Sequence, residues 1–375
     1  MPRLQDLGPM LNAPRKLRIA QVAPLYESVP PKLYGGTERI VSYLTEELVA
    51  LGHDVTLFAS GDSQSRARLI SPCPRALWLT DCADPFPPHL SMLEQVYRRR
   101  DEFDVVHFHL DFLHFRSPPT HRFVHATTLH GRLDAPRIMP LHAQFADMPL
   151  VSISMQQRTP MPGANWVANV SHGLPAGLHR LGEGGDYLVF VGRLSVEKRV
   201  DRAVEIAERA GLPLKVAAKI DPTEQDHFEA VIKPLLAKPH VEYLGEVGEA
   251  DKGELLRNAR ALIFPIDWPE PFGLVMIEAM ACGTPVIAYR SGSVPEVIDE
   301  GITGFVVNSL DDAVLAVERT KRLSRQAVRK QFEVRFTARR MATDYLKLFT
   351  CLGTLDARDR SRRAGLSYPR DKLAR

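Results

Sequence analysis

The chain has 375 residues, more than a single hydrophobic core normally supports and about the length of two α/β domains. Hydrophobic residues make up 45% of the sequence and charged residues 25%, and no apolar stretch approaches the roughly 20 residues that a membrane-spanning helix needs. A formal net charge of +3, with no basic stretch interleaved with aromatic residues, gives no indication of nucleic-acid binding.

The N-terminus and the cysteines bear on where the protein acts. Residues 1–15 contain Pro, Gly, Asp and Asn where a secretory signal would have a continuous apolar run, so we expect a disordered lead-in. The four cysteines lie far apart, a spacing that predicts neither a disulfide framework nor a metal site. We therefore expect reduced thiols in a cytoplasmic protein.

Strands and helices alternate through residues 16–175, which we predict to form the first domain. A buried strand over 17–24 is followed by Gly35 and Gly36, and then by a helix whose apolar residues recur on one face from 40 to 51. Further strands are predicted at 54–59, 104–109, 123–128, 149–154 and 165–170. This alternation is typical of a parallel sheet covered on both faces.

A second domain is predicted over residues 176–332, after glycines and a proline interrupt the pattern between 171 and 185. Its strands are expected at 187–192, 214–219, 241–245, 261–265, 285–289 and 304–307, and its helices near 200–210, 224–236 and 274–282. The predicted fold class is therefore two Rossmann-like, doubly wound parallel-sheet domains that face each other across a cleft. Ligands of such folds bind at the carboxyl ends of the strands.

The sequence pattern of the C-terminal region predicts helices and no strands. We expect residues 333–352 to form a helix that crosses back and braces the first domain. Residues 353–375 form a basic tail, for which we expect either a solvated disordered end or contact with an anionic membrane surface.

Two glutamates stand in the most informative stretch, EPFGLVMIEAMACGTPVIA (270–288). Pro271 suits the first turn of a helix, so the backbone N-H groups of Phe272, Gly273 and Leu274 are expected to open towards the cleft at its positive end. Glu270 and Glu278 are just over two turns apart if all residues between them are helical. Both carboxylates can therefore reach one elongated ligand and accept hydrogen bonds from its hydroxyl groups.

A pair of cations follows the first strand of the second domain, in GRLSVEK (192–198). Arg193 and Lys198 flank a tight turn, where they can neutralise a diphosphate. Alternatively, they form surface ion pairs with neighbouring acids such as Glu197.

The loop with Gly35 and Gly36 lets backbone N-H groups approach an anion at the start of the following helix. The dinucleotide fingerprint GxGxxG is missing from both first strand-to-helix turns, and no P-loop motif occurs. Nicotinamide and flavin dinucleotides are therefore not expected as cofactors.

Three histidines lie on or just beyond predicted strands. His130, in TTLHGR (127–132), follows a strand end and can hydrogen-bond a sugar hydroxyl or shape the reaction centre, or serve only the structure of its loop. His107 and His109 alternate on one strand face. We expect them to line the core or the cleft rather than bind a metal, because no third ligand is suitably spaced.

Together these clusters resemble the family 4 retaining glycosyltransferases, which have the two-domain GT-B architecture. The motifs GGTER (35–39), TLHG (128–131), GRLSVEK, EPFGLVMIEAMACGTPV and GSVPEVIDEGITGFVV (292–307) occur in the order that the family shows. The resemblance extends from about residue 17 to 352. It implies transfer of a hexose from a nucleotide-diphosphate sugar to a hydroxyl acceptor, with retention of anomeric configuration and without a metal or other cofactor.

The resemblance also implies a role for each matching residue. Glu278 would bind the ribose hydroxyls. Glu270 would contact the donor sugar, together with the N-H groups of Phe272, Gly273 and Leu274. Arg193 and Lys198 would hold the diphosphate. The loop with Gly35 and Gly36 would face that diphosphate from the other domain. His130 would lie near the reacting end of the donor.

The chain departs from many relatives at Arg199, where they have glycine, so we expect a tighter or more cationic loop. UDP-glucose and GDP-mannose are the leading donors, and a glycan, a lipid-linked sugar or a small metabolite would fit as the acceptor. An epimerase is an alternative on the same fold. So is a phosphorylase, in which Lys219 would hold pyridoxal phosphate. A non-catalytic nucleotide-sugar-binding protein is the alternative from another class.

Overall fold

Seven parallel strands form the first sheet of the protein. The computed structural model describes residues 15–32, 35–80, 82–115, 123–136, 138–220 and 224–365, and it describes side chains up to residue 356. The strand order is β3-β2-β1-β4-β5-β6-β7. The strands are β1 (Arg18–Val22), β2 (Asp54–Phe58), β3 (Arg68–Ile70), β4 (Val105–Phe108), β5 (His125–Thr128), β6 (Leu150–Ser152) and β7 (Trp166–Asn169). Six of these strands were predicted. The exception is β3, which follows the polar stretch 61–66 and has no apolar run of its own, whereas the equally short β6 lies within one.

Helices and short 3-10 turns connect these strands. The helices are α1 (Gly36–Ala50), α2 (Phe86–Arg98) and α3 (Met139–Gln144), and the turns are Leu77–Leu79, Arg100–Glu102 and Gln156–Arg158. The apolar face of α1 packs on the sheet, as its helical periodicity predicted.

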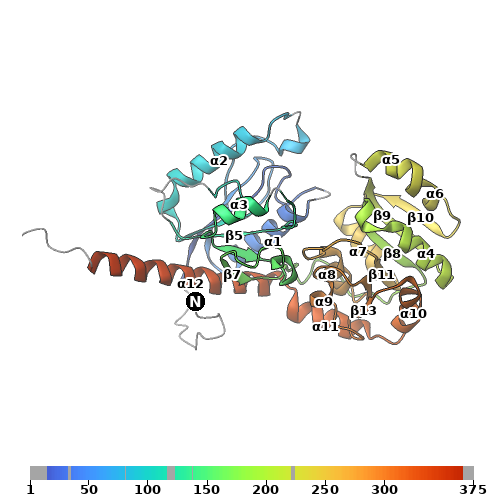
Figure 1. Ribbon diagram of the computed structural model, residues 1–375. Coiled ribbons are helices and arrows are strands. Elements are labelled where there is room, and N and C mark those ends of the chain that lie inside the picture. Colours follow the sequence, from blue (N-terminus) through green and yellow to red (C-terminus); the bar gives the residue numbers. More distant parts are fainter. Residues whose placement is uncertain are drawn as a thin grey trace, which may run out of the picture.

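Six parallel strands form the second sheet, in the order β10-β9-β8-β11-β12-β13. They are β8 (Leu188–Leu194), β9 (Leu214–Ile220), β10 (Val241–Gly245), β11 (Ala261–Phe264), β12 (Val286–Tyr289) and β13 (Gly304–Val307). The helices of this domain are α4 (Val200–Ala210), α5 (Gln225–His227), α6 (Lys233–Leu236), α7 (Glu249–Arg257), α8 (Leu274–Ala281), α9 (Val294–Val297), α10 (Leu310–Thr320) and α11 (Arg325–Arg335), with a 3-10 turn at Val196–Lys198 and a π turn at Phe228–Ile232. Both sheets are thus doubly wound, and the predicted fold class is confirmed (Figure 1).

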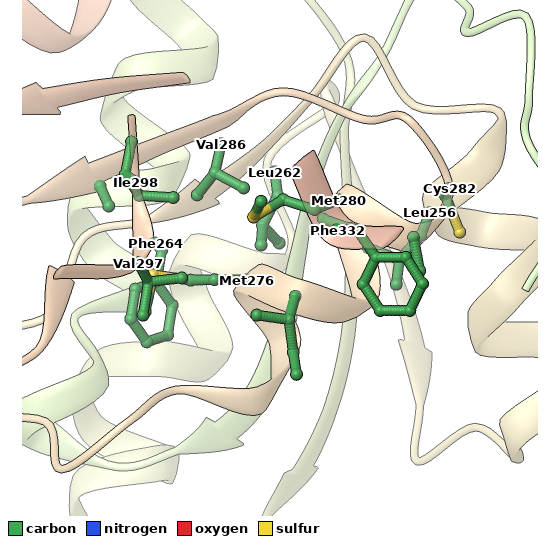
Figure 2. Packing of buried hydrophobic residues seen from close by; sticks show 14 of the residues in the cluster. Leu256, Leu262, Phe264, Met276, Met280, Cys282, Val286, Val297, Ile298 and Phe332 are labelled. Atoms are coloured by element: carbon green, nitrogen blue, oxygen red, sulfur yellow. The ribbon is translucent and has the colours of Figure 1, made fainter. Parts of the chain in front are cut away.

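Helix α8 is anchored in the largest apolar cluster of the second domain. Met276 and Met280 of α8 pack with Leu262 and Val286 of the neighbouring strands and with Phe332 of α11 (Figure 2). All five side chains are fully buried. Close packing on both sides fixes the position of α8, and with it the loop that precedes the helix.

The long C-terminal helix α12 (Ala338–Gly365) runs along the first domain (Figure 1). Tyr345 and Phe349 of α12 belong to the apolar cluster that contains Ile40 and Leu44 of α1. The chain crosses between the domains where Gly173 meets Thr337: a Cβ atom on Gly173 would lie 2.3 Å from the carbonyl oxygen of Thr337. Only glycine fits this crossing.

The bounds predicted for the C-terminal region were wrong in two respects. The bracing helix begins at Ala338 rather than 333, because Thr337 caps it by accepting a hydrogen bond from the backbone N-H of Arg340 (3.2 Å). The predicted disordered tail is helical from 353 to 365, a stretch with Leu, Ala and Arg but no proline. The remaining tail and residues 1–14 of the lead-in lie outside the described residues. Among the described helices, none is both long and apolar enough to cross a membrane.

Candidate active site

A cavity of about 510 Å³ lies between the two domains. It opens at the carboxyl ends of β1, β4 and β5 in one sheet and of β8 and β9 in the other. In both sheets the strand order reverses direction at the cavity, between β1 and β4 and between β8 and β11. Such reversal points leave a crevice in which ligands of open α/β sheets bind.

All ten residues to which the family resemblance gave a role in donor binding or catalysis line this cavity. The first domain contributes Gly35, Gly36 and His130, and the second contributes Arg193, Lys198, Glu270, Phe272, Gly273, Leu274 and Glu278. The structure therefore brings together four separate sequence motifs, which are as much as 243 positions apart from Gly35 to Glu278.

Two helix N-termini meet in the cavity. Helix α1 begins at Gly36, and helix α8 begins at Leu274 on the opposite wall. A Cβ atom on Gly36 would lie 3.6 Å from Cδ1 of Leu274, so the two ends are in close apposition. Free N-H groups and the helix dipoles make such a place favourable for an anion.

The start of α8 corrects one expectation. Pro271 is not in the first turn of the helix but three residues before Leu274, because Gly273 adopts a left-handed conformation (φ 78°) that begins the helix after it. The preceding loop is held by hydrogen bonds to its carbonyl oxygens, from Ser154 Oγ to Pro271 (2.7 Å) and from Ser293 Oγ to Phe272 (2.9 Å). The loop is thus fixed by side chains of both domains.

Lys198 and Glu270 form an ion pair inside the cavity. Lys198 Nζ lies 2.5 Å from Glu270 Oε2, and the indole N-H of Trp268 donates to the same oxygen (2.9 Å). Lys198 Nζ also lies 4.5 Å from the centre of the Trp268 ring. The lysine is therefore held at the cavity wall by a carboxylate and an aromatic face.

Arg193 both lines the cavity and bonds to Glu197, with Nη2 3.3 Å from Oε1. The two interpretations of this arginine from sequence are thus compatible. The pair is about one quarter exposed at each side chain, so it leaves the guanidinium accessible from the cavity.

A network of ion pairs surrounds Glu278. Lys252 Nζ of α7 lies 2.7 Å from Glu278 Oε1 and 3.2 Å from Glu249 Oε2. Glu249 in turn pairs with Arg39 of α1 (2.8 Å) and with His179 (3.2 Å). The pKa of Glu249 falls to about 2, because hydrogen bonding by His179 and the charges of Lys252 and Arg39 outweigh its burial. The network joins the two domains at one side of the cavity.

Three site features were not predicted from the sequence. They are the ion pair of Lys252 with Glu278, the ion pair of Arg39 with Glu249, and the position of His172 beside His130. Lys252 lies on α7, a helix that was not predicted, and 26 residues before Glu278. Arg39 does belong to the GGTER motif, and that motif is the one signal in the sequence that pointed to it.

His130 is part of a buried histidine cluster. Its Nε2 lies 2.8 Å from His109 Nδ1, and its ring stacks on His172 with centroids 5.2 Å apart. Burial lowers the pKa of His130 to about 3, and the pKa values of His109 and His172 are also lowered, by burial first and then by the neighbouring histidines. These imidazoles are therefore neutral near pH 7 and act through hydrogen bonds rather than charge.

His107 has a core position, with its ring centroid 4.1 Å from that of His109 and the two planes tilted by 53°. Its Nε2 is hydrogen-bonded to Thr128 Oγ1 (2.7 Å). Thr128 in turn contacts the hydroxyl of Tyr345 on α12 (2.8 Å). In the described part of the chain, no three side chains of His, Cys, Asp or Glu are grouped as a metal site.

Comparison with known proteins assigns the chain to a family. Residues 34–174 match Glycosyltransferase Family 4, and residues 179–335 match Glycosyl transferases group 1, so that the matches include every site residue described above. The chain belongs to the family 4 glycosyltransferases.

Relatives of this glycosyltransferase align over most of their length. O-antigen chain mannosyltransferase C of Escherichia coli is 23% identical over 374 residues, covering 88% of this chain and 98% of the relative. Glycogen synthase of Mycobacterium tuberculosis is 26% identical over 384 residues, covering 84% and 92%. These are proteins that the chain is similar to.

Solved structures show the same GT-B fold. A glycosyltransferase involved in avilamycin A biosynthesis has a TM-score of 0.72 with 23% identity, over 90% of this chain and 98% of that one. The Anabaena protein HepE, in complex with UDP and glucose, has a TM-score of 0.63 with 16% identity, over 92% and 100%. At these identities the likeness establishes the fold alone.

The unusual residue of the glycosyltransferase, Arg199, has a left-handed backbone (φ 54°, ψ 49°). This conformation favours glycine, the residue that the family resemblance led us to expect at this position. Arg199 is held by ion pairs to Asp201 (2.7 Å) and Asp267 (2.9 Å). Its charge is therefore directed to these acids on the surface of the second domain.

Proposed function

We propose that this glycosyltransferase moves a hexose from a nucleotide-diphosphate sugar to a hydroxyl acceptor, with retention of anomeric configuration. The observation that carries the proposal is the arrangement of cations and helix ends around one cavity. Arg193 and Lys198 line it together with the N-termini of α1 and α8. This is an environment for a diphosphate, since four sources of positive potential converge on one space.

The proposed mechanism is stabilisation of the leaving group. As the bond from the sugar to the phosphate breaks, negative charge grows on the departing diphosphate. Arg193, Lys198 and the helix N-H groups are already in place to stabilise it, without reorganisation. Because these fixed cations take the role that a metal ion has in other transferases, we propose that the reaction needs no metal.

The other site residues are proposed to bind and orient the donor. Glu278, which is buried at the cavity wall, would accept hydrogen bonds from the ribose hydroxyls, and Glu270 would bind the donor sugar. His130, neutral near pH 7, would hydrogen-bond the sugar near its reacting carbon. UDP-glucose and GDP-mannose are the leading donors. A mannosyltransferase among the relatives and a solved relative with bound UDP and glucose support this choice.

We also propose a location for the enzyme. The four cysteines are all free, which supports a cytoplasmic enzyme. Peripheral contact with an anionic membrane surface would be made by the basic C-terminal tail.

The test measures release of nucleoside diphosphate from UDP-glucose, GDP-mannose and ADP-glucose, with and without EDTA. We expect one donor to be cleaved at equal rates in both conditions, and NMR to show that the first-formed sugar product keeps the donor's anomeric configuration. Arg193→Ala should lower the rate by about 100 to 1,000-fold. Arg209→Ala, at an exposed ion pair of α4, serves as the matched control and should not change it.

Three outcomes would contradict the proposal. Loss of activity with EDTA would overturn metal independence, and an inverted product would overturn retention. Conversion of the donor sugar without release of nucleotide would identify an epimerase instead.

A further inference from the structure

The wall of the cavity that belongs to the first domain differs in chemistry from the donor wall. It carries two aromatic side chains, Tyr26 and Trp78, and two carboxylates, Glu38 and Asp111. None of these four has a place in the proposed binding of the donor. Tyr26, Trp78 and Asp111 line the cavity from the segments after β1, β3 and β4, and Glu38 lines it from the first turn of α1.

Trp78 is presented to solvent although it is a large apolar residue. It lies in the 3-10 turn Leu77–Leu79 and is 64% exposed. The turn is hydrogen-bonded to the loop after β1, from the N-H of Trp78 to the carbonyl of Tyr26 (3.0 Å) and from the N-H of Leu77 to that of Leu25 (2.8 Å). The Tyr26 and Trp78 rings have centroids 5.2 Å apart and planes tilted by 31°. Together they form an aromatic surface at the cavity.

His89 holds this surface from behind. Its Nδ1 lies 2.7 Å from the carbonyl oxygen of Pro85, and its Nε2 lies 3.2 Å from the N-H of Leu25. The carbonyl can only accept and the backbone N-H can only donate, so the ring is neutral with its proton on Nδ1. Burial lowers the pKa of His89, which favours the same neutral form. The ring packs 5.1 Å from Tyr26, so the aromatic surface is fixed before a ligand binds.

The charge on this wall is acidic. Glu38 is buried beneath the surface, and Asp111 is open to the cavity at a left-handed turn (φ 50°). The pKa of the Tyr26 hydroxyl is raised, chiefly by burial and then by the nearby carboxylates of Asp111 and Glu38. Arg39, on the same wall, is engaged by Glu249. Lys219 lines the cavity from the donor wall, and its charge partly offsets the rise that burial causes in the pKa of Glu27 on the first domain.

We propose that this surface binds an uncharged pyranose as the acceptor, with the apolar face of the sugar ring on Trp78 and Tyr26 and its hydroxyl groups donating to Asp111 and Glu38. An aromatic ring offers a flat apolar area that matches the C-H face of a pyranose, and carboxylates accept hydrogen bonds from vicinal hydroxyls. Burial raises the pKa of Asp111 only to about 6, so this carboxylate is mostly charged near neutral pH and repels a phosphate. The acceptor is therefore a neutral glycan end rather than a phosphorylated sugar. This inference rests on the proposed function and specifies its acceptor.

The experiment measures acceptor binding and turnover with defined probes. Intrinsic tryptophan fluorescence measures the binding of four neutral sugars: methyl glucoside, methyl mannoside, maltose and cellobiose. Glucose 6-phosphate and mannose 6-phosphate are titrated as the charged counterparts. We expect at least one neutral sugar to change the fluorescence and to be glycosylated, with the phosphorylated counterparts at least about tenfold weaker. Trp78→Ala should raise the KM for that neutral sugar by about tenfold or more and leave the donor KM unchanged.

The controls separate this inference from the proposed function. Phe86→Ala removes an equally prominent aromatic side chain, 52% exposed but outside the cavity, and should leave both KM values unchanged. Asp111→Asn keeps a residue that tolerates the left-handed turn and should reduce the discrimination against the phosphorylated sugars. Equal or tighter binding of the phosphorylated sugars, no binding of any neutral sugar, or an unchanged acceptor KM in Trp78→Ala would each overturn the inference. Failure to cleave any nucleotide sugar would instead overturn the proposed function.

Discussion

Lys198 and Glu270, 72 residues apart in sequence, are joined by a 2.5 Å ion pair in the cavity, so a proposed diphosphate cation and a proposed sugar-binding carboxylate form one unit before any ligand is bound. Both side chains are nearly buried, at 13% and 11% exposed. The pair keeps each charge compensated in the unliganded protein. It also fixes the lysine where the leaving group would lie.

Removal of the lysine should therefore affect both stability and catalysis. Lys198→Ala leaves the Glu270 carboxylate with the Trp268 N-H but without its cation, and we expect a loss of about 1 to 3 kcal/mol in stability. Nucleotide release should fall by about 100 to 1,000-fold. In the double variant Lys198→Ala/Glu270→Gln the melting temperature should recover and the activity should not. Recovery of activity in the double variant would show that Lys198 serves only to neutralise Glu270.

Lys252 should be a positioning residue for Glu278. The side chain of Lys252 is 13% exposed and that of Glu278 5%, so Lys252→Met leaves a buried carboxylate without its closest cation. Breaking a buried pair in this way typically costs about 3 to 5 kcal/mol. We expect a lower melting temperature, and a weaker affinity for the donor because the carboxylate loses its orientation.

The double variant Lys252→Met/Glu278→Gln should regain much of the lost stability but not the affinity, as measured by calorimetric titration of the donor. Lys321→Met, in an exposed pair with Glu318, is the matched control and should change neither quantity. Wild-type donor affinity in Lys252→Met would contradict the positioning role.

The left-handed backbone of Arg199 predicts an order of stability between two variants. Both Arg199→Gly and Arg199→Ala lose the ion pairs to Asp201 and Asp267. Only glycine adopts this backbone without strain, so Arg199→Gly should be more stable than Arg199→Ala by about 1 kcal/mol, a difference of about 2 to 4 °C in melting temperature. Equal melting temperatures would mean that the turn relaxes out of the left-handed region.

Glu38 should make stability depend on pH. Burial raises the pKa of its carboxyl from 4.5 to about 7, so the folded chain binds this proton more tightly than the unfolded chain. The resulting stabilisation is complete below about pH 4.5 and is lost as the pH rises through about 7. Relative to Glu38→Gln, the wild type should lose about 3 kcal/mol over this range and nothing further above it.

Thermal unfolding of the two proteins from pH 4.5 to 8.5 makes this comparison. Glu205→Gln, at an exposed position of α4, should follow the wild type at every pH. Parallel curves for wild type and Glu38→Gln would contradict the assignment of this titration to Glu38.

Much of the fold could be predicted from the sequence because buried parallel strands are short apolar runs. The runs that became β1, β8, β9 and β11 are of this kind, and Val200–Ala210 shows a clear helical period. Helices α2 and α7 were not predicted. In α7 the charged residues Glu249, Asp251 and Lys252 leave too few apolar positions for a clear period.

Those residues of the site that belong to motifs of the family could be predicted from the sequence. Gly36 and Glu278 were identified in this way and lie on the same cavity. Tertiary partners have no such signal. Lys252 reaches Glu278 only because α7 packs beside α8, and the role of Trp78 depends on a turn that lies beside Tyr26 in space. Contacts of this kind depend on the packing of whole elements.

The most direct measurement of the central claim is a thermal-shift panel of UDP-, GDP- and ADP-sugars without metal, on wild type, Glu278→Ala and the exposed control Glu318→Ala. A ligand stabilises only the state that it binds. We predict that sugars of one nucleotide raise the melting temperature of the wild type and of Glu318→Ala. Glu278→Ala should lose most of this shift, because the missing hydrogen bonds cost about 1.5 to 3 kcal/mol of binding. No shift with any nucleotide sugar in folded wild-type protein would contradict the proposal that this cavity is a donor site.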